Sequence, residues 1–153
     1  MKNNLNILLK IILFMDKAQL IETFNTHFIE FITDIERVFP ENTDITLARK
    51  TISKTNTILP KLLIKLFHDY FSAIYSKEID AGDLDFFVKN DYRAKHGYKE
   101  NEEAWVLEKI DCLREPVRAM DAKDKAIVVQ YLKNLKKLSD AYIILKKELK
   151  DIK

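Results

Sequence analysis

Glycine, proline and cysteine are all scarce in this chain of 153 residues. Its two glycines and three prolines supply too few turn residues for hairpin series, β-propellers, β-sandwiches or a glycine-rich phosphate loop. The single cysteine, Cys112, excludes an internal disulfide framework and a multi-cysteine zinc site. These absences favour a fold that is made of helices.

The residue types that are abundant fit one folded domain. Apolar residues make up 47% of the chain and charged residues 33%, and the 26 basic and 24 acidic side chains leave a net charge of +2. This balance is typical of a soluble globular domain and unlike the composition of a disordered chain. We therefore expect an all-α, single-domain bundle of about five helices in residues 15–153.

An apolar N-terminal extension, residues 1–14, precedes this domain. Its run from Leu5 to Phe14 contains Asn6 and Lys10 and is roughly ten residues long, whereas a membrane span needs about 20. The residues at 15–17, Met-Asp-Lys, do not form the small-residue cleavage site of a secretory signal. We expect no membrane span, and two interpretations stay open: translated upstream sequence, or an extra helix laid on the bundle.

Apolar residues recur at spacings of three and four along the domain, which predicts amphipathic helices. We expect the first helix to start at the N-cap Asp16 and end before Pro40, and the second to be capped by Thr43 or Asp44. A third helix, stopped by Gly82, has the widest apolar stripe and should be the most buried. The residues of that stripe are Leu62, Leu63, Leu66, Phe67, Tyr70, Phe71, Ile74 and Tyr75.

Two further helices are predicted after a polar stretch. The fourth starts near Asn101, buries Trp105, and ends or kinks before Pro116. The last helix is capped by Asp121 and runs towards the C-terminus. At 1.5 Å per residue it is about 45 Å long, which exceeds the size of a compact chain of this length, so its end should project.

The last helix carries an apolar stripe with the heptad spacing of a coiled coil. Because an apolar stripe on a projecting helix needs a partner, we expect it to bind another protein or a second copy of the chain. The alternative is that the stripe packs on the first helix of its own bundle. The predicted partner-binding residues are Tyr131, Leu135, Leu138, Tyr142 and Leu145.

The segment 80–92 alternates acids with apolar residues, and we expect it to form an ordered recognition loop. One alternative is a metal-dependent enzyme, in which the carboxylates of Asp80–Asp91 hold a divalent cation, although the glycine does not fit the register of a calcium loop. The other is that Asp83 or Asp85 caps a short helix whose phenylalanines enter the core. The predicted partner-binding residues of the loop are Asp83, Asp85, Asp91 and Tyr92.

Common catalytic motifs are missing from the chain, including HExxH, GxSxG, GKS or GKT, and the dinucleotide fingerprint. His27, His68 and His96 each lack a second ligand at metal spacing, and Cys112 has no histidine near it in the sequence. We interpret all four as packed or surface residues. The expectation is therefore no enzyme activity, no metal site and no cofactor.

Nucleic-acid binding ranks below protein binding as an alternative function. The lysine-rich last helix would contact phosphates, although a lysine face is more often simply solvated. The residues that would make these contacts are Lys133, Lys136, Lys137, Lys146 and Lys147.

Three parts of the chain carry a family resemblance. They read FIEFITDIERVFPENTDI at 28–45, GDLDFFVKNDY at 82–92, and LREPVRAM with QYLKNLKKLSDAY at 113–120 and 130–142. In these parts the chain resembles a group of small proteins encoded by giant viruses, the large double-stranded DNA viruses of protists and algae. The resemblance covers residues 15–142 and implies a viral origin, with a location in the virion or the host cytoplasm. It transfers no functional residues.

These observations together predict a non-enzymatic protein-interaction protein, or a minor virion or assembly protein of a giant virus. It would act through the helical seam of the last helix and through the acidic, aromatic loop.

Overall fold

The computed structural model describes residues 14–89 and 101–151, and every regular element within these ranges is a helix. This confirms the predicted all-α bundle with a long C-terminal helix. The elements are α2 (Lys17–Val38), α3 (Thr43–Ile58), α4 (Leu62–Phe67), the π-helix η1 (His68–Ser72), α5 (Ala73–Ala81), α6 (Asp85–Lys89), α8 (Glu102–Asp111), α9 (Arg114–Ala119) and α10 (Ala122–Asp151).

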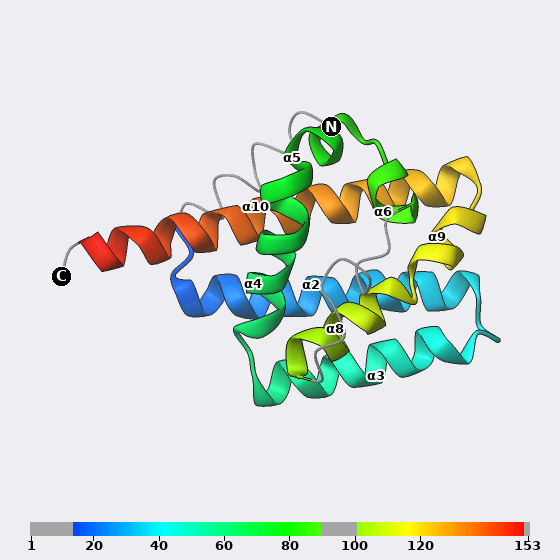
Figure 1. Cartoon of the computed structure of the whole chain (residues 1–153), viewed down its shortest axis with the longest axis horizontal. Helices are drawn as coiled ribbons and strands as arrows, with labels where there is room; N and C mark the ends of the chain where they lie inside the picture. The colour runs from blue at the N-terminus through cyan, green and yellow to red at the C-terminus, as the bar shows by residue number, and fades with distance from the viewer. Residues whose placement is uncertain (1–13, 90–100, 152–153) are drawn as a thin grey trace.

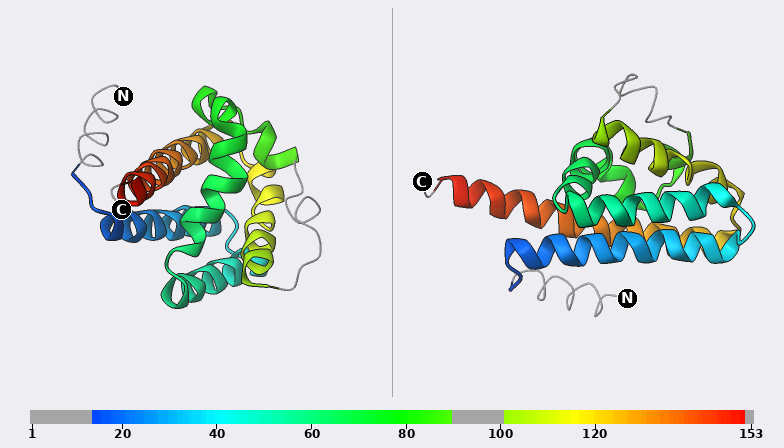
Figure 2. Two further views of the ribbon diagram at one scale, coloured as in Figure 1. Left: turned by 60° about the vertical axis from the view of Figure 1, so that its left-hand side comes forward. Right: turned by 90° about the horizontal axis from the view of Figure 1, so that it is seen from below.

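Three long helices, α10, α2 and α3, lie side by side, and α4, η1 and α5 run across one face of them (Figure 1). Helix α8 packs on α3 and α4, and α9 packs on α6. In the right-hand view of Figure 2, α2 lies at one edge of the molecule, and none of the other described helices lies beyond it. The core therefore sits between the three long helices and the short ones, and the opposite face of α2 is left uncovered by the described elements.

Helix starts follow local capping chemistry. The Asp16 carboxylate accepts from the backbone N–H of Gln19 at 2.8 Å, and the Gln19 amide oxygen accepts from the N–H of Asp16 at 2.9 Å, so α2 begins with a reciprocal capping box. Asn101 and Asp121 cap α8 and α10 with a single bond each, in which the side-chain oxygen accepts from the backbone N–H three residues later. The cap of α3 is Asn42, one residue earlier than the sequence predicts.

The predicted third helix contains a π-turn that the sequence pattern does not indicate. Residues 68–72 form η1, and a further kink follows at Tyr75, whose φ and ψ are −114° and 30°. One extra residue in a helical turn rotates the face of all later residues by about 100°. Phe67 and Phe71 are buried, as expected, whereas Ile74, which follows the π-turn, is 60% exposed. The prediction that Ile74 belongs to the buried stripe was wrong for this reason.

The fourth predicted helix also differs from the expectation in one position. Trp105 is 55% exposed, and the buried face of α8 is formed by Val106, Leu107 and Ile110. Since α8 has only ten residues and packs on one side, against α3 and α4, its indole side turns to solvent. Pro116 lies in the first turn of α9, where a missing N–H is tolerated, so the chain ends α8 and starts a new helix.

Within residues 14–89 and 101–151, no helix combines the length and the apolar content that a bilayer crossing requires.

Candidate interaction surfaces

The apolar stripe of α10 is largely part of the core. Leu135, Leu138 and Tyr142 are each at most 2% exposed, and α10 packs against α2, η1, α4 and α5 of the same chain. These three residues therefore follow the alternative in which the stripe packs within its own bundle. They are not accessible to a partner in this fold. Tyr131 and Leu145, at the two ends of the predicted seam, are partly buried.

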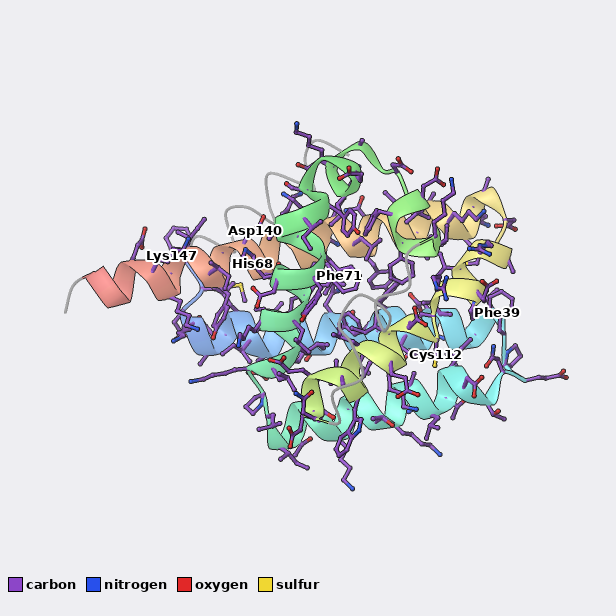
Figure 3. The ribbon with its side chains drawn as sticks, viewed as in Figure 1. Phe39, His68, Phe71, Cys112, Asp140 and Lys147 are labelled. Atoms are coloured by element: carbon purple, nitrogen blue, oxygen red, sulfur yellow. The ribbon has the colours of Figure 1, made fainter. Side chains whose placement is uncertain are left out.

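The projecting end of α10 begins just after this buried part. The ammonium group of Lys17, the first residue of α2, lies 5.7 Å from the ring centroid of Tyr142. Helix α10 continues nine residues further to Asp151, which is about 13 Å at 1.5 Å per residue. Figure 3 places Lys147 on this projecting end. Ile144 is 58% exposed there, so an apolar side chain stands in solvent beside lysines.

Tyr131 joins α10 to α2 through a polar contact. Its hydroxyl donates to the carboxylate of Asp34, which also pairs with the guanidinium of Arg37. Burial and the hydrogen bond to Asp34 both raise the pKa of Tyr131. The ring centroid of Tyr131 is 4.8 Å from that of His27 and 5.3 Å from that of Phe31. The tyrosine therefore belongs to the helix interface rather than to a free seam.

His27 is held in the same interface. Its Nδ1 atom lies 3.4 Å from the carboxylate of Glu30, and its Nε2 atom lies 3.4 Å from the amide nitrogen of Asn134. Burial lowers the pKa of His27, although Glu30 and Asp34 act in the opposite direction. This arrangement fits the predicted packed histidine. His96 lies outside the described residues.

A groove of about 1030 Å³ follows the outer face of α2. Ile21 and Ile29 of α2 line the groove. Residues from the second half of α3 and Tyr131 of α10 also line it. Two smaller hollows, of about 230 and 340 Å³, lie between α2 and α10 and also reach Tyr131. Sequence reasoning missed this groove, because no periodic signal marks the polar face of α2 as a concave surface.

Two amide oxygens in the groove lack hydrogen bonds. Asn25 donates through its amide nitrogen to the carbonyl of Pro60 at 2.9 Å, which fixes its orientation. Among the described residues, neither Oδ1 of Asn25 nor Oδ1 of Asn56 has a hydrogen-bond partner, and both atoms are buried. A buried acceptor without a donor costs free energy, so these two oxygens lower the stability of the α2–α3 contact.

The acidic loop is built around a helix start. Gly82 ends α5 in the left-handed conformation, with φ of 74°, and the Asp83 carboxylate accepts from the N–H of Asp85 at 2.9 Å. Phe86 and Phe87 of α6 are buried in the core. The Asp83 side chain thus binds the first N–H of α6 from two residues earlier, and the burial of the two phenylalanines agrees with the capping alternative.

The other acids of this region have local partners. Asp85 pairs with Lys89 at 3.2 Å, and Asp80 pairs with Lys136 at 3.3 Å. Within residues 14–89 and 101–151, no three histidine, cysteine, aspartate or glutamate side chains are grouped so that they could hold a metal ion. Asp83 and Asp85 are exposed, and the remaining predicted loop residues, Asp91 and Tyr92, lie outside the described residues.

The lysines of the nucleic-acid alternative have different environments. Lys136 pairs with Asp80 and, at 3.3 Å, with Asp140. Burial and the nearby charge of Lys133 lower the pKa of Lys137. Lys146 and Lys147 are exposed on the projecting end of α10. The five lysines therefore do not form one free basic stripe.

A polar network links the π-helix to α10. The hydroxyl of the buried Ser72 donates to Asp140, which also pairs with Lys136. Figure 3 labels Asp140 on α10 and His68, the first residue of η1. π-Turns often occur at functional sites, but every polar group named in this network has a partner within the chain. The network therefore holds η1 against α10.

Cys112 follows α8 and is partly buried. Burial raises the pKa of its thiol, which favours the unreactive protonated form. This agrees with the predicted packed cysteine.

The chain was compared with protein-family models, curated proteins and solved structures, and none of the three comparisons finds a match.

Proposed function

We propose that the chain is a non-enzymatic protein-interaction protein whose docking element is the projecting end of α10. The observation that carries the proposal is the exposed apolar side chain of Ile144 on a helix end that extends beyond α2 (Figure 1). Docking this end against a partner helix would remove apolar surface from water. Lys146 and Lys147 are exposed beside Ile144, so the partner surface should carry acidic groups around an apolar centre.

The location of the exposed apolar surface favours the helix end over the predicted seam. Leu135 and Leu138 are already covered by the same chain, so a partner reaches them only if the bundle opens. Ile144 needs no such opening. Asp83 and Asp85 are exposed, and we retain them as a second contact region of the proposed partner surface.

The experiment compares two substitutions at exposed apolar positions. Ile144→Asp alters the projecting end, and Leu47→Asp alters an exposed leucine on α3 as the matched control. Self-association is measured by light scattering of the full chain over a range of concentrations, and binding to other proteins is measured by capture with the purified chain. We expect Ile144→Asp to abolish the association and Leu47→Asp to leave it unchanged. A wild-type chain that remains monomeric and captures no protein contradicts the proposal.

We propose a viral setting for this activity, as a minor virion or assembly protein of a giant virus. The support is the resemblance of residues 28–45 and 82–92, with the two later stretches, to small proteins of such viruses. Proteomics of purified particles tests it. A fixed stoichiometry in particles supports a structural part, presence only in infected cells supports an adaptor of the host cytoplasm, and absence from both overturns the viral setting.

A further inference from the structure

The groove on the outer face of α2 is suited to a tethered apolar segment. It extends from Ala18, in the first turn of α2, to Arg37 in the last, and the helix rises about 28 Å between these two residues. Ile21, Ile29 and Pro60 provide apolar surface along this length. The groove therefore begins at the end of α2 where residues 1–13 join the described chain.

The charges of the groove define its occupant further. Glu22, Glu30 and Asp34 line it together with Arg37 and Lys61, and Arg37 is already paired with Asp34. An occupant should therefore be apolar and should carry a positive charge.

The sequence that precedes α2 has this chemistry. Residues 5–13, LNILLKIIL, are apolar except for Asn6 and for Lys10, which has a positive charge. Phe14, which follows them, is 89% exposed, whereas Met15 packs against the core. The chain is therefore anchored at Met15, directly beside the start of the groove.

Length and tethering both favour an occupant from the same chain. The nine residues 5–13 span about 14 Å as a helix, which is half of the groove, and up to about 30 Å when extended, which is its whole length. Only Phe14, Met15 and Asp16 separate them from α2. A short tether gives an effective concentration on the order of millimolar, which a second copy in dilute solution does not reach.

We propose that residues 5–13 bind in the groove between α2, α3 and Tyr131 of the same chain. This surface is distinct from the projecting end of α10, so the inference does not depend on the proposed function. Bound there, the segment covers Ile29, and its lysine lies among the three acids of the groove.

The test uses paramagnetic broadening of amide resonances in the full chain. A spin label is attached at Ser53→Cys, on the exposed rim of the groove, in a Cys112→Ser background. The control label is at Ile74→Cys, an exposed position on α5. We expect the resonances of residues 5–13 to lose several-fold more intensity with the label at residue 53 than with the label at residue 74. Equal effects from the two labels overturn the proposal.

Dilution and substitution complete the test. The spin-labelled protein is then mixed with an excess of protein that carries neither the spin label nor isotopes. Broadening within one chain stays unchanged in this mixture. Loss of the broadening shows that a second copy occupies the groove, which overturns the proposal. Leu9→Asp lies outside the described fold and should abolish the broadening while the thermal melting curve keeps its cooperative shape. Ile29→Asp, on the groove side, should do the same, and persistent broadening in both variants also overturns the proposal.

Discussion

The hydroxyl of Tyr131 on α10 donates a hydrogen bond to the carboxylate of Asp34 on α2, 97 positions earlier in the chain. This contact joins the two longest helices of the described structure at the point where the groove and both smaller hollows meet. It is therefore both a structural link and part of the wall of the groove that we propose for residues 5–13.

Removing this hydroxyl should weaken the fold without opening a cavity. Tyr131→Phe keeps the ring contacts with His27 and Phe31, and should lower the free energy of unfolding by about 1–2 kcal/mol because a hydrogen bond to a charged acceptor is lost. Urea denaturation followed by circular dichroism measures this change. In a double-mutant cycle with Asp34→Asn, the two losses should be less than additive. Fully additive losses contradict a direct interaction.

The buried position of His27 makes stability depend on pH. Because burial lowers its pKa below the ordinary 6.5, the folded chain binds the proton less readily than the unfolded chain does. The contribution of His27 is therefore fully present above pH 6.5 and is lost progressively as the pH falls through the lowered pKa. Urea midpoints between about pH 8 and pH 5 should fall more steeply in the wild type than in His27→Gln. NMR titration of the imidazole should give a midpoint below 6.5, and a midpoint above it refutes this account.

Gly82 should be sensitive to any side chain with a Cβ atom. Its φ of 74° lies in the left-handed region, and an added Cβ would meet Cγ1 of Val129 at 3.4 Å. Gly82→Ala should therefore cost about 1 kcal/mol of folding free energy. Gly82→Asn is the matched variant, because asparagine tolerates this conformation better than alanine does. Thermal denaturation should rank the wild type first, then Asn, then Ala; an alanine variant as stable as the wild type would disprove the strain.

Two positions on α10 should lose very different amounts of stability on the same substitution. Leu138 is buried, so Leu138→Asp should lower the free energy of unfolding by at least about 3 kcal/mol because a charge enters the core. Ile144 is exposed, so Ile144→Asp should change it by no more than about 0.5 kcal/mol. Equilibrium unfolding of both variants checks the boundary between the buried and projecting parts of α10. If both variants lost similar amounts of unfolding free energy, the boundary between the buried and projecting parts of α10 would not lie between residues 138 and 144.

Helix starts and the overall class were predictable from the sequence because the interactions that set them are local. Asp16, Asn101 and Asp121 cap helices through N–H groups three residues away, and no tertiary contact is needed to recognise that pattern. The buried residues of α2 follow from its regular spacing for the same reason. The left-handed stop at Gly82 is equally local.

The candidate surfaces depended on contacts between residues far apart in the chain. The spacing of α10 is compatible with an external seam or with packing on α2, and only the folded chain places Leu138 inside and Ile144 outside. The π-turn at 68–72, which turns Ile74 outward, and the exposure of Trp105 likewise depend on which neighbours compete for the core. Lys136 meets Asp80, and Tyr131 meets Asp34, only after folding. Composition, caps and periodicity thus determined the helices of this protein, while packing decided which of their faces remain available, because burial is a property of the whole assembled chain.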